Sequence, residues 1–565
     1  MRPLTKTLRQ ARNPRLLAAS AATGVIVALV VAAFETLALH VVLERVLHQN
    51  LAVLALAPVL GVGASKLVLR TVGGGTSGAT SDEYVRAFHE RHPSLPFRFL
   101  PAKLLAGVAT IGSGGAVGLE GPSLYAGSSV GLFVHERLGR FFRRDEARLL
   151  LTAGAAAGVA AVFKTPATGV IFALEAPYRD DVTPQALLPS LIASAASYVT
   201  FVFLVGSTPV VPFLGEGPVD VDGAAAMLDV QIGDLLGALI LGIAAGLGGR
   251  GFAWLVRRAK HATHTVPWPR RAVAAAAAMA GLTVLADAAF GEVLSLGPGT
   301  RAMEWVVQQD ALELIALLFG VRLAATLATV LGDGVGGLFI PLATLGVIGG
   351  QFVGVALDAE STGLYATLGL AAFLGAGYRA PIAAVMFVAE STGAAAFVVP
   401  ALVAAAVSQV VGGPSSVTEY QRSKRLGHIE QRFTLPLSSV LTTDVLTVPP
   451  DATVSEFVYM HVLARRERVV PVVDGSNYLG MARLSRLPSV SRDEWETTTV
   501  ESMMTTDMPA GSPSWTVRDA VVAMEAADVE ILAVTDSQGN FIGVVTEDDV
   551  VRLGEILEET EGGEG

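Results

Sequence analysis

Residues 103–131 read KLLAGVATIGSGGAVGLEGPSLYAGSSVG, and residues 322–350 read RLAATLATVLGDGVGGLFIPLATLGVIGG. The two stretches align without a gap, 219 positions apart, and share a basic first residue, an Ala-Thr pair, several glycines and one proline. A long internal echo of this kind indicates that the chain contains two related halves.

A second shared block follows each stretch. It begins with the residues Phe163-Lys164-Thr165-Pro166 in the first copy and Tyr378-Arg379-Ala380-Pro381 in the second, and in both copies the proline precedes a glutamate by nine residues. Ordered agreement over two blocks makes a chance match improbable, and two related halves in an apolar chain are typical of transporters and channels.

The composition predicts a polytopic α-helical membrane protein. Hydrophobic residues make up 52% of the chain and charged residues 16%, and the mean hydropathy is +0.54. Apolar runs close to the length of a membrane span lie before about residue 415: Leu17–Ala33, Leu51–Val68, Leu187–Val205, Leu235–Leu255, Ala272–Phe290 and Phe397–Val411. We therefore expect a transmembrane domain over 16–425, with halves at about 16–215 and 225–412. Segments broken by Gly and Pro are expected to line the ion path.

Charge and cysteine content limit location and partners. Residues 1–15 contain five basic residues and no acid, which predicts a cytoplasmic N-terminal segment. The net charge is −11, and the part after Leu426 holds 24 acids against 9 bases, so we expect no nucleic-acid partner. There are no cysteines, which excludes disulfides and thiolate metal sites.

The polar C-terminal part also repeats. After Pro436, short β-branched strands alternate with amphipathic helices, and the pairs Thr453-Val454 and Thr516-Val517 each precede a glycine by 27 residues. Each unit resembles a CBS domain, which predicts an α/β tandem pair at 436–494 and 498–558, followed by an acidic tail at 559–565. We expect this tail region to be cytoplasmic.

The CBS resemblance implies an adenine nucleotide as a ligand of the pair. The second copy carries the family's hydroxyl and carboxylate as Thr546 and Asp549, whereas the first copy has Arg483 and Arg486 at those positions. Thr546 and Asp549 could equally form a helix cap without any ligand, and the sequence leaves both readings open.

Two segments of the membrane part predict helix starts inside the bilayer. In Gly118-Leu119-Glu120-Gly121-Pro122, glycines free the backbone and proline favours a first helical turn, so a helix should begin near Pro122. Gly337-Leu338-Phe339-Ile340-Pro341 repeats this pattern. Unpaired N–H groups at two such helix starts would together attract an anion.

These two segments resemble the signatures of the CLC family of chloride channels and proton-coupled chloride transporters, and the remaining blocks follow the family's order. The resemblance implies two inverted halves, a homodimer with one pore per subunit in the lipid bilayer, and no enzyme activity or required cofactor. It makes Glu120 the gate, whose carboxylate competes with chloride for backbone N–H groups and responds to protons. The implied anion-binding residues are Gly118, Leu119, Glu120, Gly121, Pro122, Gly337, Leu338, Phe339, Ile340 and Pro341.

The sequence departs from the family pattern at three places. The early loop that supplies a hydroxyl has Gly74 at that position, so Thr76 or Ser77 would have to supply it after a shift of register. The tyrosine expected after Gly413 has no clear counterpart, and Thr418 or Tyr420 could take its place. Proton exchangers usually carry a glutamate directly after the position of Glu175, where this chain has Ala176.

Because of Ala176, we expect a channel-like chloride conductor in the cell membrane, gated by Glu120. The alternatives are a proton-coupled chloride antiporter and a transporter selective for another anion such as fluoride or nitrate. A CBS-regulated divalent-cation transporter is a remote alternative, because it would need several intramembrane carboxylates together. An intramembrane metalloprotease would need H-E-x-x-H, whereas the nearest sequence, His89-Glu90-Arg91-His92, is one residue too short.

Overall fold

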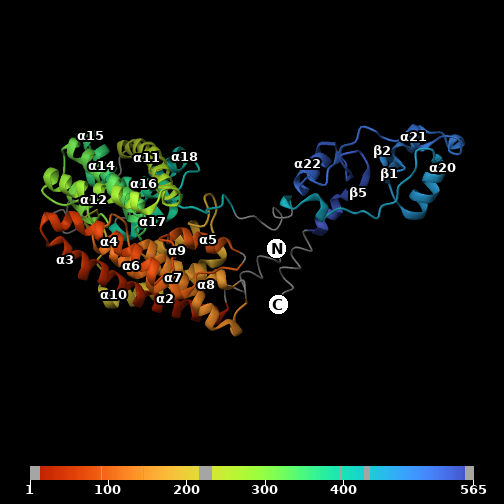
Figure 1. Cartoon of the computed structure of the whole chain (residues 1–565). Helices are drawn as coiled ribbons and strands as arrows, with labels where there is room; N and C mark the ends of the chain where they lie inside the picture. Colours follow the sequence, from red (N-terminus) through yellow and green to blue (C-terminus); the bar gives the residue numbers. More distant parts are fainter. Residues whose placement is uncertain are drawn as a thin grey trace. The chain divides into compact units, whose positions relative to one another are not determined.

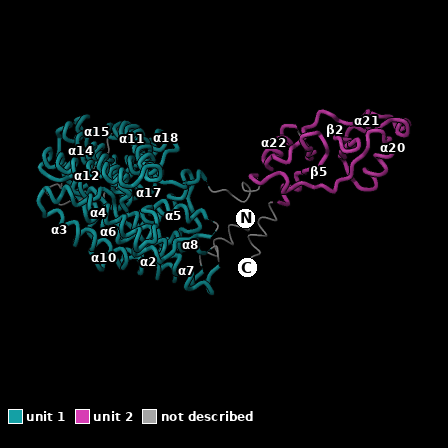
Figure 2. The backbone as a smooth tube through the Cα atoms, viewed as in Figure 1, with its two compact units in different colours: residues 1–425 teal, residues 426–565 magenta. Residues whose placement is uncertain are grey.

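The chain forms two separate units, which Figure 1 shows by element and Figure 2 by colour. The computed structural model describes residues 13–90, 92–143, 146–214, 232–393, 397–424, 433–527 and 529–553. The first unit spans residues 1–425 and the second residues 426–565. The predicted acidic tail at 559–565 and most of the predicted N-terminal segment lie outside the described residues.

Helices form the first unit. Eight helices of its described part are long and apolar enough to cross a membrane, and the others are shorter because Gly and Pro interrupt them, as α9 and α17 illustrate. The principal helices are α2 (Pro14–Glu35), α4 (Leu51–Thr71), α5 (Ser81–His89), α6 (Leu100–Gly112), α7 (Glu120–Arg137), α8 (Glu146–Phe163), α9 (Pro166–Glu175), α10 (Leu187–Val205), α11 (Ile232–Thr265), α12 (Trp268–Phe290), α13 (Thr300–Val306), α14 (Leu312–Leu331), α15 (Phe339–Ala356), α16 (Thr362–Tyr378), α17 (Pro381–Thr392) and α18 (Val398–Gly412). A π-helical stretch, Thr36–Leu43, and the short α3 (Glu44–Leu47) extend α2.

Reciprocal hydrogen bonds join the two repeats where α7 and α15 begin. The Gly118 N–H donates to the Gly337 carbonyl at 2.9 Å, and the Gly337 N–H donates to the Gly118 carbonyl at 2.8 Å. Before these helix starts, the Thr110 hydroxyl accepts from the Val335 N–H at 3.0 Å. The repeat-related Thr329 hydroxyl accepts from the Ala116 N–H at 3.1 Å. The aligned stretches therefore face each other across a local two-fold relation.

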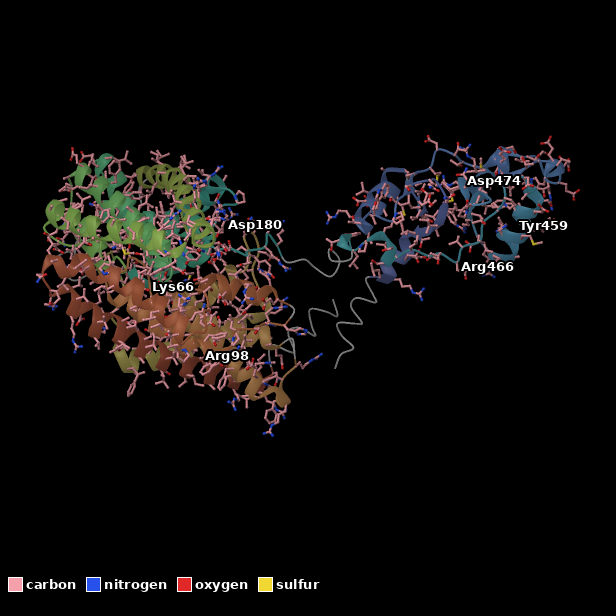
Figure 3. The ribbon with its side chains drawn as sticks, viewed as in Figure 1. Lys66, Arg98, Asp180, Tyr459, Arg466 and Asp474 are labelled. Atoms are coloured by element: carbon pink, nitrogen blue, oxygen red, sulfur yellow. The ribbon has the colours of Figure 1, made fainter. Side chains whose placement is uncertain are left out.

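An ion pair joins α4 to the loop that leads into α15. Lys66 of α4, labelled in Figure 3, bonds the carboxylate of Asp333 in the loop before α15. Asp333 has a left-handed backbone, with φ of 72°. Because asparagine and aspartate tolerate this conformation better than most residues, the chain can turn sharply there before the second helix start.

Glycines bring helix backbones into contact in each half. A methyl group on Gly127 of α7 would lie 1.9 Å from the Gly154 carbonyl oxygen of α8. In the second half, a methyl group on Gly346 of α15 would lie 2.4 Å from the Gly369 carbonyl oxygen of α16. Such close approach between membrane helices is the usual reason for small residues at their interface.

The two glutamates that follow a proline by nine residues cap helix starts in each other's repeat. Glu390, near the end of α17, accepts from the N–H groups of Ala167 and Thr168 at the start of α9, at 2.8 and 2.7 Å. Glu175, at the end of α9, accepts from the Ala383 N–H near the start of α17 at 2.8 Å. Each carboxylate thus satisfies orphan N–H groups at a positive helix end.

Glu390→Gln is expected to lower the free energy of unfolding by about 1–3 kcal/mol, because a neutral amide makes weaker bonds to these N–H groups and offers a single acceptor oxygen. Thermal unfolding of the detergent-purified protein measures the loss. Glu360→Gln, at an exposed position, is the matched control. An equal melting temperature for both variants would mean that the capping bonds contribute nothing.

The second unit contains two small sheets. In the first, β1 (Val469–Asp474) pairs antiparallel with β2 (Asn477–Arg483). In the second, β3 (Ala510–Gly511) runs parallel to β4 (Ile531–Thr535), which pairs antiparallel with β5 (Phe541–Thr546). The accompanying helices are α20 (Val454–Glu456), a π-helical stretch (Phe457–Leu463), α21 (Val500–Met503) and α22 (Val517–Ala527). Each sheet has its own apolar core.

Candidate anion site

Glu120 is the first residue of α7, and its carboxylate lies against the first turn of α15. Its Oε1 accepts from the Phe339 N–H at 2.5 Å, and the Ile340 N–H faces the same carboxylate. The side chain is buried, with 2% of its surface exposed. We call this carboxylate position, against the N–H groups of Phe339 and Ile340, the Glu120 seat. The two predicted helix starts therefore meet at one buried point.

One oxygen of the Glu120 carboxylate is held and the other is not. Oε2 is buried and has no hydrogen-bond partner among the residues that the structure describes. A buried acceptor without a partner costs about 1–3 kcal/mol. The carboxylate is therefore held less firmly than one whose two oxygens both accept hydrogen bonds.

Two glycines make room for the seat. A methyl group on Gly118 would lie 1.9 Å from Glu120 Oε2, and one on Gly337 would lie 2.2 Å from Glu120 Oε1. Neither distance is compatible with a side chain, so the carboxylate can fold back onto the α15 N–H groups only where both positions are glycine.

The other predicted residues of the two segments serve the backbone and the core. Both helices begin two residues earlier than the prolines predict, at Glu120 and Phe339. The Phe339 ring packs on Phe163 and Phe387, with centroid distances of 4.5 and 5.1 Å. Leu119, Leu338 and Ile340 are buried as well. These buried side chains pack the two helix starts into the core, whereas the Phe339 N–H contacts the Glu120 carboxylate.

Thr80 brings a hydroxyl to the first helix start, at a position that we did not predict. A methyl group on Gly121 would lie 2.4 Å from Thr80 Oγ1, and this hydroxyl donates to the Gly336 carbonyl at 3.4 Å. Gly74 and Ser77 are exposed, Thr76 is half-buried, and the Ser77 hydroxyl instead bonds Glu83 at 2.8 Å. The loop continues past these three residues before α5 begins at Ser81, so the hydroxyl at this helix start comes from a residue later in the chain than Gly74, Thr76 or Ser77.

Lys103 holds the loop that carries Thr80. Its ammonium group is buried, donates to the Ala79 carbonyl and lies 3.4 Å from a Glu83 oxygen. It also stands over the Tyr125 ring, 4.6 Å from the centroid. The basic residue that opens the first repeat is therefore a positioning group for the adjacent hydroxyl.

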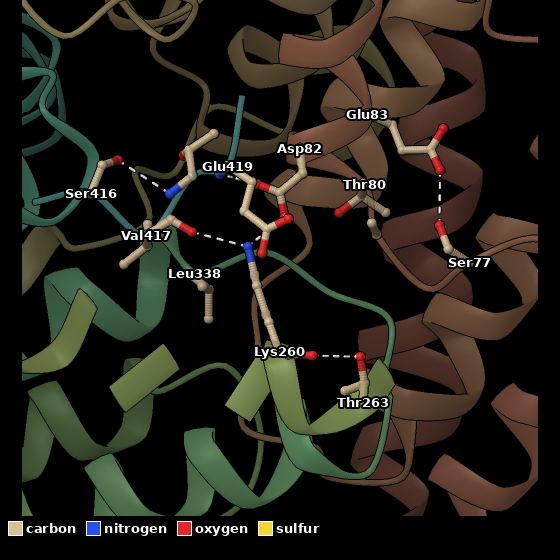
Figure 4. Close-up of polar contacts among 12 residues, drawn as sticks. Ser77, Thr80, Asp82, Glu83, Lys260, Thr263, Leu338, Ser416, Val417 and Glu419 are labelled. Atoms are coloured by element: carbon tan, nitrogen blue, oxygen red, sulfur yellow. Dashed lines mark hydrogen bonds and ion pairs between the residues drawn. The ribbon is translucent and has the colours of Figure 1, made fainter. Parts of the chain in front are cut away.

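A network of hydrogen bonds and an ion pair joins α5, α11 and the segment after α18, as Figure 4 shows. The Lys260 ammonium bonds Asp82 and donates to the Val417 carbonyl at 2.9 Å. Asp82 also accepts from the Glu419 N–H at 2.9 Å. The network fixes the start of α5 to the segment that follows α18.

The segment after Gly413 does not bring a tyrosine to the seat. Tyr420 is 56% exposed and has a left-handed backbone. Thr418 is buried, and its hydroxyl has no partner among the described residues. The tyrosine that does reach the site is Tyr378, whose hydroxyl oxygen accepts from the Leu338 N–H at 3.3 Å. A signal for it was present in the sequence, because Tyr378 is the repeat counterpart of Phe163 with an added hydroxyl.

In the second unit, Thr546 and Asp549 bond each other. The Thr546 hydroxyl donates to Asp549 Oδ2 at 2.7 Å, and the Asp549 N–H donates back to that hydroxyl at 3.1 Å. This is the helix-capping arrangement that the sequence left open. An adenine nucleotide at these residues stays a prediction.

Comparison with known proteins agrees with this architecture. A family described as voltage gated chloride channel matches residues 61–413, and the CBS domain family matches residues 437–487 and 500–555. The H(+)/Cl(-) exchange transporter ClcA of Salmonella typhi is 29% identical over 353 residues, covering 60% of this chain and 71% of the relative. ClcA of Cronobacter sakazakii is 30% identical over 358 residues, covering 60% and 72%.

Solved structures share the fold. A slow cyanobacterial Cl-/H+ antiporter superimposes with a TM-score of 0.62 at 22% identity, covering 71% of this chain and 94% of that one. A eukaryotic CLC transporter gives a TM-score of 0.58 at 18% identity and covers 95% of this chain and 98% of that one. These likenesses confirm the predicted CLC-like helical unit with a tandem CBS pair. The chain therefore belongs to the voltage gated chloride channel family and is an integral membrane anion transporter.

Proposed function

We propose that this protein exchanges chloride for protons across a membrane, with Glu120 as the group that links the two fluxes. The contact between the Glu120 carboxylate and the Phe339 N–H, at 2.5 Å, carries the proposal. An ionised carboxylate and a chloride ion would compete for the same N–H groups, because both are anions that replace water with backbone donors. The exchange activity named for the matched relatives points the same way.

The exchange cycle follows from this competition. While Glu120 is ionised, its carboxylate holds the seat and keeps an anion out. Protonation removes the charge that strengthens the bond to the Phe339 N–H, so the side chain leaves and an anion enters. When the proton is released toward the other side of the membrane, the carboxylate returns and displaces the anion. Each return therefore couples one proton to anion movement.

This proposal replaces the channel preference that Ala176 suggested. Passive chloride conduction is the second candidate, since Ala176 supplies no carboxylate at the position where exchangers usually carry one. Fluoride or nitrate in place of chloride is a third, and it is supported by a fold neighbour described as a CLC-type fluoride/proton antiporter, which is 22% identical with a TM-score of 0.61. A homodimer, the bilayer of the cell membrane and cytoplasmic termini remain part of the proposal.

Three carboxylates of the described part argue against divalent-cation transport, and no group of three or more metal-ligating side chains occurs among the described residues. Glu120, Glu175 and Glu390 all accept hydrogen bonds from backbone N–H groups. A carboxylate that already accepts hydrogen bonds at a positive helix end has fewer oxygen lone pairs left for a metal ion, whereas a divalent cation needs several free oxygens around one point.

Proteoliposomes test the exchange directly. An outward chloride gradient is imposed without a proton gradient, and chloride efflux and internal pH are recorded together. Exchange predicts proton movement into the vesicles against a growing proton gradient. Chloride efflux without any proton movement would establish the passive channel, and fluoride flux exceeding chloride flux would reassign the anion.

A further inference from the structure

Tyr378 brings a buried hydroxyl to the N–H group next to the Glu120 seat. It is the last residue of α16, and 2% of its surface is exposed. Its ring stands edge-on to Phe172, 5.2 Å between centroids, and 6.2 Å from the Phe339 ring. The ring therefore lies among aromatic side chains, while the hydroxyl lies among polar groups that include the Ser81 side chain.

The hydroxyl and the Glu120 carboxylate occupy consecutive N–H groups of one helix start. The Leu338 N–H donates to Tyr378 Oη at 3.3 Å, and the next N–H, of Phe339, donates to Glu120 Oε1 at 2.5 Å. Oη accepts from the Leu338 N–H and also bonds the Ser81 side chain, so its own proton can be donated either to Ser81 or to an anion beside it. An anion that takes the place of the carboxylate would lie beside this proton.

The segment after Gly413 supports Tyr378 and does not replace it. The Val417 N–H donates to the Gly377 carbonyl at 2.9 Å, and the Gln421 amide donates to the Tyr378 carbonyl at 3.1 Å. Arg379 bonds the Gly413 carbonyl and pairs with Asp180 at 2.5 Å. The turn that carries Tyr378 is therefore fastened on both sides, which fixes the direction of the ring.

We propose that the Tyr378 hydroxyl is the side-chain ligand of the transported anion, donating a hydrogen bond to a monovalent anion such as chloride at the Glu120 seat. The proposal rests on the proposed function and specifies its binding site. It assigns to the end of α16 a role that the family resemblance placed after Gly413, at Thr418 or Tyr420. Two independent observations converge on this point: the α15 helix start, and the buried Glu120 Oε2 without a partner among the described residues.

Chloride binding to the purified full-length protein tests the proposal. In a Glu120→Ala background, which removes the competing carboxylate, isothermal titration calorimetry measures the chloride dissociation constant. Tyr378→Phe keeps the ring and is expected to raise this constant at least about tenfold, through the loss of one hydrogen bond to a charged ligand. Tyr84→Phe is the matched control, because it removes a buried hydroxyl that donates to the Ala173 carbonyl at 2.7 Å.

A second readout separates ligation from packing. Tyr378→His restores a polar donor and is expected to recover part of the affinity. Tyr378→Phe is also expected to change the ratio of chloride to nitrate flux in proteoliposomes, which a purely structural role would leave unchanged.

The possible outcomes are distinct. Weakened binding in Thr418→Val but not in Tyr378→Phe would overturn the proposal and assign the hydroxyl to Thr418. Unchanged binding in both would also overturn it and leave the backbone N–H groups and the Thr80 hydroxyl as the remaining ligands. Either result would leave chloride exchange by the wild-type protein intact. Absence of chloride binding and flux in every variant and in the wild type would instead remove the proposed function together with this inference.

Discussion

Replacing Glu120 by glutamine is expected to abolish proton movement while chloride flux continues. Glutamine cannot carry a proton between the two sides, and its neutral amide forms a weaker bond with the Phe339 N–H than the carboxylate does at 2.5 Å. The seat is then open to anions for more of the time, so chloride efflux from proteoliposomes should equal or exceed that of the wild type. A simultaneous pH recording should stay at background.

Glu44→Gln is the control for this experiment, since Glu44 is exposed and its side-chain contact is an ion pair with His40. It should leave both fluxes unchanged. If Glu120→Gln still drove protons uphill, another group would have to carry them and Glu120 would lose its linking role. If the variant folded but conducted no chloride, the carboxylate would be a required part of the anion path and not its gate.

Features that occur in both repeats could be predicted from the sequence. The aligned glycines and prolines located both helix starts, because a helix that begins inside an apolar stretch needs flexible residues before it and tolerates proline in its first turn. The CBS pair was equally accessible from its two matching strand patterns. Both signals are local, so no knowledge of the packed structure was needed.

The residues that were missed depend on how distant segments meet. Thr80 lies beside Gly121 only because the loop before α5 continues to Ser81, and loop length cannot be read from composition. The basic residues that open the two repeats show the same limit. Lys103 holds the Ala79 carbonyl, whereas Arg322 donates to all five carbonyls of residues 294–298. The repeat predicted that they correspond, but not that each binds a different loop.

The glutamates of the second block, Glu175 and Glu390, were also predicted only in part. Their spacing from proline is visible in the sequence, but their hydrogen-bond partners are not. The structure shows that Glu175 and Glu390 cap the starts of each other's helices. A capping bond between residues more than 200 positions apart leaves no local pattern, although the symmetry of the repeat makes the exchange reciprocal once one half of it is known.

Gly118→Ala is expected to open the gate without removing the gating residue. The added methyl group would lie within 2.8 Å of Glu120 Oε2, Cδ and Oε1. All three atoms belong to the far end of a flexible side chain, so the carboxylate can move away and the fold can persist. Chloride efflux from proteoliposomes should then continue with reduced proton movement, close to the behaviour of Glu120→Gln.

Gly337→Ala is expected to act differently although it also meets Glu120. Its methyl group would lie 2.2 Å from Glu120 Oε1 and also 2.6 Å from the Gly121 backbone nitrogen, which cannot move without displacing α7. We expect a sharp loss of folded protein on size-exclusion chromatography. The same column should show a normal yield for Gly118→Ala.

A Glu120→Ala background separates the two effects. Glu120→Ala removes each of the three Glu120 atoms that Gly118→Ala would strike, so adding Gly118→Ala to it should change neither flux nor yield. Adding Gly337→Ala should still reduce the yield, because the clash with the Gly121 nitrogen remains. Such non-additivity is the mark of residues in direct contact. If Gly118→Ala lowered the yield equally in both backgrounds, the glycine would serve the backbone alone, and the view that it makes room for a movable carboxylate would be wrong.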